Sequence, residues 1–141
     1  PQGIQLTGNF HPAYFQTRFF TDAAVADWPD AFVIISAYAT TGETWTDEQN
    51  READASLAQE LREQHEWMVR ITGYAPDGSH AEPSWATDMP VHQALALGVR
   101  YRQDAIYGVK GDHLTVIRCN RPNDTAPVGP FRKRVHVRRT T

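Results

Sequence analysis

The clearest pattern in the chain is an apolar run that passes into a polar loop and then into an amphipathic segment. Phe32-Val-Ile-Ile35, within residues 31–38, is short and β-branched, which is typical of a buried strand. Small polar residues and one glycine follow over residues 36–45. Thr46 and Gln49 then have the spacing of a capping box, which predicts that a helix begins at this point.

The segment from Thr46 to about Gln64 is predicted to be this helix. Ala53, Leu57 and Leu61 recur at intervals of four residues, so they share one face, and acidic residues are available for the solvated faces. We therefore expect the three apolar side chains to pack against a sheet.

Two hairpins are predicted further along the chain. The first joins strands at 67–74 and 81–87 through Pro76-Asp-Gly78, a strong turn signal. The second joins strands at 103–109 and 114–119, with a glycine in the connection.

A second, shorter helix is predicted to begin at Pro90, run through Leu97 and stop at Gly98. Residues 120–130 contain three prolines and a glycine, so a loop is expected there. Alternation of valine with polar residues predicts a final strand over 131–137.

These elements predict an α+β fold, with a mostly antiparallel sheet and two helices packed on one of its faces. The length of 141 residues is that of one domain. Its expected parts are a leader and aromatic segment (1–29), a core (30–119), a proline-rich loop (120–130) and a basic C-terminal strand (131–141). The aromatic-rich stretch 11–20 fits either a strand or a short helix, and both stay open.

The composition is that of an ordinary globular protein, with 40% hydrophobic and 22% charged residues. No apolar run approaches the length of a membrane helix, and the start of the sequence does not resemble a signal peptide. The single cysteine, Cys119, excludes an internal disulfide and suits a reducing compartment. A cytoplasmic location is therefore expected, with no membrane partner.

Positive charge is concentrated at the C-terminus. Residues 131–141 contain no acid and five cations, which are Arg132, Lys133, Arg134, Arg138 and Arg139. The other 130 residues hold nine cations against 17 acids, a balance of −8. Two interpretations stay open: the tail packs on its own acidic body as a strand, or it is an arm for nucleic acid or another anionic partner.

Polar residues with useful chemistry occur at the predicted strand ends and at the start of the long helix. Candidate ligand-binding residues are Ser36, Tyr38, Thr41, Asn50, Ser84 and Gln103. Glu82 is the candidate catalytic residue, since a carboxyl group removed from water can act as a general acid or base. Ser84 shares a strand face with it, but no histidine follows at a spacing diagnostic of a nucleophilic serine.

Metal and cofactor chemistry have little support in the sequence. The six histidines are scattered without paired spacing, and only one cysteine is present, so no metal site is expected. Thr40-Thr-Gly42 is too short for a glycine-rich phosphate loop. No cofactor is therefore expected.

A succession of short motifs resembles a known family. These are Phe32-Val-Ile-Ile-Ser-Ala-Tyr38, Thr41-Gly-Glu43, Asp47-Glu-Gln-Asn50, Glu82-Pro-Ser84 and Gln103-Asp-Ala-Ile-Tyr107. Their order and spacing over residues 30–110 resemble the uncharacterised bacterial family DUF3293. Ala39-Thr40 stands where that family pattern has Asn-Pro, so any role of that asparagine is altered here. The resemblance implies no established activity.

Two functional hypotheses follow from these observations. In the first, a small polar molecule binds in a cleft formed by the 36–45 loop and the strand ends, and whether a reaction follows stays open. In the second, the protein is not an enzyme and docks to a larger assembly or nucleic acid through its basic tail and aromatic N-terminal segment. The first predicts a concave pocket and the second an exposed apolar or basic patch.

Overall fold

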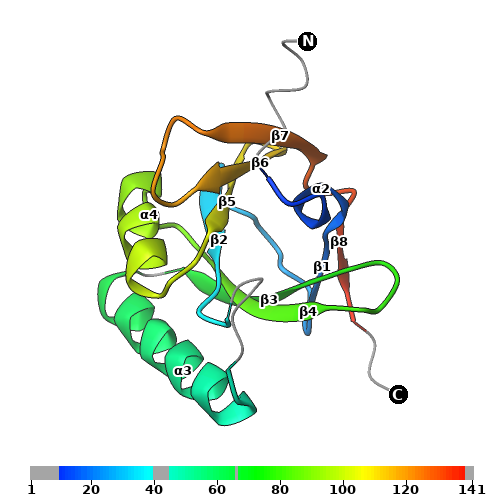
Figure 1. Cartoon of the computed structure of the whole chain (residues 1–141). Coiled ribbons are helices and arrows are strands. Elements are labelled where there is room, and N and C mark those ends of the chain that lie inside the picture. The colour runs from blue at the N-terminus through cyan, green and yellow to red at the C-terminus, as the bar shows by residue number, and fades with distance from the viewer. Residues whose placement is uncertain (1–9, 40–44, 66, 139–141) are drawn as a thin grey trace.

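The computed structural model describes residues 10–39, 45–65 and 67–138, and one sheet of eight strands organises this part of the chain (Figure 1). The strands are β1 (Arg18–Thr21), β2 (Ala31–Ile35), β3 (Met68–Tyr74), β4 (Ala81–Thr87), β5 (Ala105–Lys110), β6 (His113–Arg118), β7 (Thr125–Pro130) and β8 (Val135–Val137). The helices are α2 (Ala13–Gln16), α3 (Asp47–Gln64) and α4 (Val91–Arg100). Across the sheet the order is β7-β6-β5-β2-β4-β3-β1-β8.

The predicted fold class, a mostly antiparallel sheet with two helices on one face, is wrong. The sheet is mixed, because β8 pairs in parallel with β1, and it curls into a half-barrel, which three helices accompany in the part of the chain that the structure describes (Figure 1). The additional helix, α2, comes from the aromatic segment, which forms both a short helix and a strand.

The curl follows from a short connection between the two edge strands. β7 ends at Pro130 and β8 begins at Val135, at opposite edges of the sheet. Five residue steps span at most about 18 Å, so a flat sheet of eight strands could not be joined in this way. The sheet must bend until its edges approach each other.

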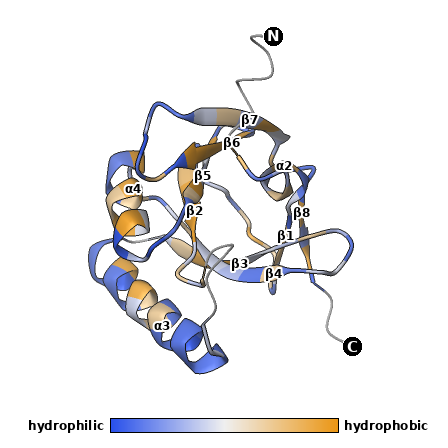
Figure 2. Cartoon of the chain, viewed as in Figure 1, coloured by the Kyte–Doolittle hydropathy of each residue, from blue (hydrophilic) through white to orange (hydrophobic). Residues whose placement is uncertain are grey.

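The apolar run in β2 is buried on both faces of this curled sheet. Phe32 and Ile34 belong to a cluster on the concave face, whereas Val33 and Ile35 belong to a second cluster on the convex face. Figure 1 places α3 and α4 against the convex face, and Figure 2 shows α3 as hydrophilic toward both ends with hydrophobic residues between them. The predicted buried strand is thus confirmed, and its burial on both faces explains why the run does not alternate.

The predicted long helix is also confirmed. The Thr46 hydroxyl accepts a hydrogen bond from the Gln49 backbone N–H at 3.0 Å, and the Gln49 side chain accepts one from the Thr46 N–H at 2.8 Å. Leu57 and Leu61 are fully buried in the convex cluster, and Ala53 packs against it. Both predicted hairpins are present, with their glycines, Gly78 and Gly111, at φ values of 80° and 60°.

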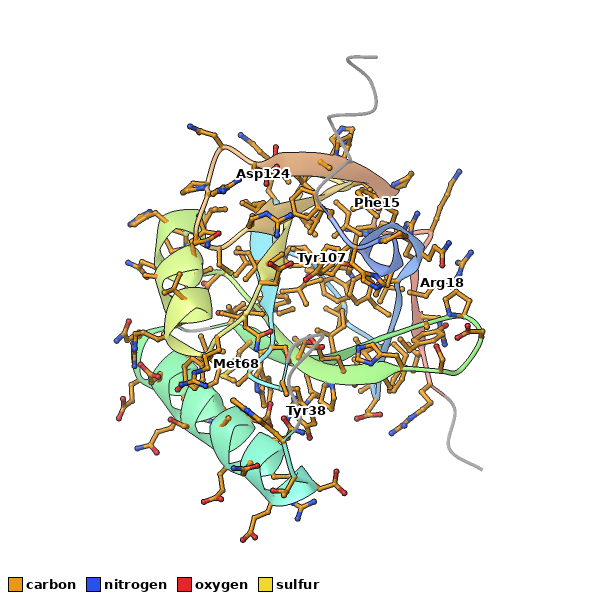
Figure 3. The ribbon with its side chains drawn as sticks, viewed as in Figure 1. Phe15, Arg18, Tyr38, Met68, Tyr107 and Asp124 are labelled. Atoms are coloured by element: carbon orange, nitrogen blue, oxygen red, sulfur yellow. The ribbon has the colours of Figure 1, made fainter. Side chains whose placement is uncertain are left out.

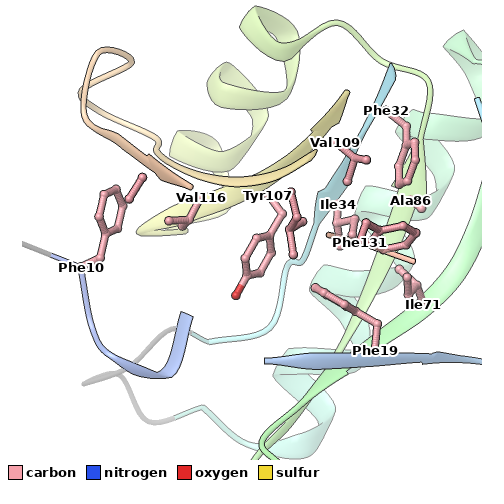
Figure 4. Close-up of a cluster of buried hydrophobic side chains, with 12 residues drawn as sticks. Phe10, Phe19, Phe32, Ile34, Ile71, Ala86, Tyr107, Val109, Val116 and Phe131 are labelled. Carbon is pink, nitrogen blue, oxygen red and sulfur yellow. The ribbon is translucent and has the colours of Figure 1, made fainter. Parts of the chain in front are cut away.

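The tail packs on its own domain, although only part of it is a strand. Phe131 is completely buried in the concave cluster, residues 131–134 form a turn, and β8 covers the last three residues of the predicted strand (Figure 4). The Arg134 guanidinium donates to the backbone carbonyls of Phe15 and Thr17, each at 3.0 Å, and to that of Val128 at 3.3 Å. Arg134 thereby joins β7 to the N-terminal segment.

The proline-rich segment 120–130 is only partly a loop, because its second half forms β7. β7 is an edge strand, so a proline can occupy it without leaving a neighbouring strand unpaired. Pro127 lies opposite Thr115, next to an irregularity in the register between Leu114 and Thr115. A β-bulge of this kind relieves the pairing that proline cannot make.

α4 continues through Gly98, where the sequence predicted its end. A Cβ at this position would overlap the Cys119 Sγ, so the close approach of α4 to the end of β6 requires glycine. The chain leaves the helix instead at Arg102, which has a φ of 59°. The glycine is therefore a packing residue and not a helix stop.

Gly98→Ala is expected to reduce the free energy of unfolding by about 1–3 kcal/mol through overpacking, although alanine normally favours a helix interior. In a Cys119→Ala background the added Cβ would meet the Cβ of residue 119 and the Cγ2 of Ile106, each at 3.5 Å, which is ordinary van der Waals contact, so the same substitution should be neutral or stabilising. Equilibrium urea unfolding of the four proteins measures this coupling. An equal effect of Gly98→Ala in both backgrounds would contradict the packing explanation.

Candidate functional site

A cavity of about 250 Å³ lies on the concave side of the sheet, and residues from α2 and from β1 to β5 contribute to its wall. Four of the predicted site residues line it, namely Ser36, Glu82, Ser84 and Gln103. Phe19, Ile34 and Tyr107 of the concave apolar cluster form part of the same wall. Figure 3 shows Tyr107 projecting from β5 toward α2 in the interior of the curl.

Strand alternation brings the polar residues to this face. In β4, Glu82 and Ser84 occupy the positions that alternate with Trp85, and Ala86 continues the same row into the concave cluster. Ser36 continues the inward-facing row of Phe32 and Ile34 beyond the end of β2. The neighbouring antiparallel strands β2 and β4 thus place hydroxyl and carboxylate groups around the same cavity.

Ser36 and Gln103 are buried and fix the backbone around the cavity. The Gln103 Nε2 donates to the carbonyl of Tyr38 at 2.7 Å and to that of Tyr101 at 3.2 Å. The Ser36 hydroxyl donates to the Pro83 carbonyl at 3.0 Å and accepts from the Tyr38 N–H. Both side chains therefore hold the segment after β2 in place as well as presenting polar atoms to the cavity.

Among the described residues that line the cavity, Glu82 is the one with a carboxylate side chain. Its Oε2 lies 3.5 Å from the Nε2 of His80, and the Glu82 side chain is 27% exposed against 61% for His80. The hydrogen bond to Glu82 raises the pKa of His80, because the carboxylate favours the imidazolium form. The Ser84 hydroxyl donates to the backbone carbonyl of Glu82 at 3.1 Å, so it is not paired with a base that could activate it.

The sequence did not identify the aromatic wall of the cavity. Tyr14, Phe19, Tyr74 and Tyr107 all line it. The Tyr107 hydroxyl donates to the Tyr14 carbonyl at 2.8 Å, and the Tyr14 hydroxyl donates to Asp104 at 3.1 Å. Burial is the main cause that raises the pKa of both Tyr14 and Tyr107, with Glu82 acting in the same direction, so both phenols are neutral.

The remaining predicted site residues lie elsewhere. The Tyr38 side chain does not contribute to the cavity wall, and the Asn50 Oδ1 accepts from the Ala39 N–H at 2.8 Å, which ties α3 to the segment after β2. Thr41 and Arg139 lie outside the described residues. In the tail, Arg138 pairs with Asp22 at 2.9 Å. Arg132 and Lys133 are exposed, and Arg134 has the backbone contacts given above.

The described residues contain no group of three or more His, Cys, Asp or Glu side chains that could hold a metal ion. None of the described helices is long and apolar enough to cross a membrane. A cytoplasmic location stays a prediction.

Comparison with known families matches residues 35–106 to the model described as "Protein of unknown function (DUF3293)". The chain belongs to the DUF3293 family. The match includes Ser36, Glu82, Ser84 and Gln103, which line the cavity, and it confirms the resemblance seen in the sequence motifs. Neither the comparison with curated proteins nor the comparison with solved structures finds a match.

Proposed function

We propose that this DUF3293 protein binds a small polar molecule in the cavity on the concave side of its sheet. The observation that carries the proposal is the convergence of Ser36, Glu82, Ser84 and Gln103, from separate parts of the chain, on one cavity with aromatic walls. A concave, partly apolar pocket with a few convergent polar groups is typical of a ligand site.

The size of the cavity restricts the ligand. Its volume of about 250 Å³ is just below the range of about 300–1,000 Å³ that accommodates drug-sized ligands. We therefore propose that the cavity binds a small metabolite, or one terminal group of a larger molecule. Ser36, Ser84, Gln103 and Glu82 are proposed to contact it, and Tyr38 and Asn50 to position the segment after β2. Glu82 is the group available for acid–base chemistry if a reaction takes place.

The alternative, docking through the basic tail, has less support. Phe131 is buried in the domain, and Arg134 and Arg138 already have partners within the chain. These contacts explain the tail as part of the fold, and only its exposed cations, such as Arg132 and Lys133, are available to a partner.

A thermal-shift screen with neutral, cationic and anionic polar molecules tests the binding proposal. A ligand at 100 times its Kd adds about 2.7 kcal/mol of apparent stability, which such a screen detects readily. Ala75 is half-buried on the cavity wall, so Ala75→Trp should block the cavity. The control is Ala24→Trp, because Ala24 is exposed and does not line the cavity.

We expect the stabilising ligand to lose its effect in Ala75→Trp and to keep it in Ala24→Trp. Isothermal titration calorimetry of the same three proteins then gives the affinities. A screen in which no class of small molecule stabilises the protein, or in which Ala75→Trp binds as well as the parent, would refute binding in this cavity.

A further inference from the structure

We infer that the ligand carries a positively charged nitrogen, held between the Glu82 carboxylate and the aromatic wall of the cavity. This inference rests on the proposed function and specifies the chemical class of the ligand. Three observations support it: the charge of the residues that line the cavity, the aromatic side chains among them, and the position of the His80 imidazole beside Glu82.

The charge of the cavity favours a cation. Among the described residues that line it, Glu82 is an acid and none is a lysine or arginine, while His11 and His80 are the basic groups. Arg134 is near enough to affect Tyr107, but its guanidinium donates to three backbone carbonyls. When His11 and His80 are neutral, the cavity therefore has a net negative charge. An anionic ligand would then place a second negative charge beside Glu82.

The aromatic wall favours the same class of ligand. Tyr14 and Tyr107 have ring centroids 6.1 Å apart, and those of Phe19 and Tyr107 are 5.4 Å apart, both pairs in edge-to-face arrangement. Aromatic faces attract organic cations through the ring quadrupole, and neutral phenols keep this property without adding charge. Because burial keeps Tyr14 and Tyr107 protonated, neither phenol adds charge to the cavity, and Glu82, which lines the same cavity, is near enough to raise the pKa of both.

His80 shows that a cationic nitrogen can be placed beside Glu82. Its Nε2 is 3.5 Å from the Glu82 Oε2, and its side chain is largely exposed, so a ligand can displace it. A protonated imidazole at this position imitates the proposed ligand and competes with it. A neutral imidazole does not neutralise the carboxylate, which then attracts another cation.

A matched set of three probes separates charge from shape. Choline is the cation, 3,3-dimethyl-1-butanol is its neutral isostere, and 3,3-dimethylbutyrate is an anion of similar size. Ethanolamine added to the set distinguishes a primary ammonium, which donates hydrogen bonds, from a quaternary one, which depends on the aromatic rings. Measurements near pH 8.5, about two units above the ordinary imidazole pKa, reduce competition from His80.

We expect choline, ethanolamine or both to bind at least about tenfold more tightly than the neutral and anionic probes, measured by calorimetry. Glu82→Gln, which keeps the shape of the side chain, should weaken cation binding by about 10- to 100-fold and leave the neutral probe unchanged. His80→Ala should preserve or strengthen cation binding, because it removes the competitor. Circular dichroism and thermal melting of each variant verify that it is folded.

The outcomes separate this inference from the proposed function. If an anionic or neutral molecule binds, is excluded by Ala75→Trp and is indifferent to Glu82→Gln, the cavity is a ligand site but the inference is wrong. If cations bind equally well to the parent, Ala75→Trp and Glu82→Gln, they bind outside the cavity and the inference is also wrong. If no molecule of any charge binds, both the inference and the proposed function fail.

Discussion

Phe131→Ala is expected to reduce the free energy of unfolding by about 3–5 kcal/mol, the largest effect of any substitution considered for this protein. Phe131 is completely buried, and its ring centroid lies 4.9 Å from that of Trp28 and 5.3 Å from that of Phe32. Figure 4 shows it within the cluster that fills the concave face. Truncation would remove this ring from the core and leave a cavity between the two edges of the sheet.

Arg132→Ala is the matched control, because this neighbouring side chain is exposed and its backbone N–H, not its guanidinium, bonds to Asp112. We expect it to change the stability by less than about 0.5 kcal/mol. Urea unfolding monitored by fluorescence measures both variants. If Phe131→Ala were as stable as the parent, the tail would not be part of the core, and its interpretation as a free basic arm would regain support.

Local signals in the sequence were sufficient for several elements of the fold. The capping box at Thr46 and the turn glycines at 78 and 111 act within a few residues, so their structures could be predicted without knowledge of the rest of the chain. The curl of the sheet could not, because it follows from the short connection between β7 and β8, whose Phe131 and Arg134 contact segments more than 100 residues earlier. Nothing in the local pattern indicates such pairs.

Gly98 and Pro127 show a second reason for the errors. Each residue type has a common local role, as a helix stop or a loop residue, and the prediction assigned that role. In the structure each has a role set by a neighbour, since Gly98 allows α4 to approach Cys119 and Pro127 occupies an edge strand. Tertiary packing decides which role applies.

The candidate site was predictable to the extent that it depends on strand alternation. Glu82 and Ser84 are two residues apart, so a strand necessarily places them on one face, and both line the cavity. The aromatic wall was missed because Tyr14 comes from a segment whose secondary structure the sequence left open. Tyr107 reaches it only because the sheet curls, and the hydrogen bond from its hydroxyl to the Tyr14 carbonyl spans 93 residues. Sequence could identify the polar groups but not the surface that encloses them.

The segment that borders the cavity depends on α3 as well as on the sheet. Asn50, in the first turns of α3, accepts a hydrogen bond from the Ala39 N–H, and Gln103 donates to the Tyr38 carbonyl. These two amides hold the chain after β2 at successive residues, Tyr38 and Ala39. The position of α3 on the convex face therefore contributes to the geometry of a cavity on the concave face.

Leu57→Ala is expected to have the second-largest effect on stability. Leu57 is completely buried between α3 and the convex face, so its truncation should reduce the free energy of unfolding by about 2–5 kcal/mol. Leu57→Met, which conserves volume, should cost less than about 1.5 kcal/mol. Urea unfolding followed by circular dichroism measures both. A decrease of the helical signal well before the sheet unfolds would indicate that α3 detaches alone. A decrease of the free energy of unfolding by less than about 1 kcal/mol for Leu57→Ala would contradict the placement of Leu57 in the core.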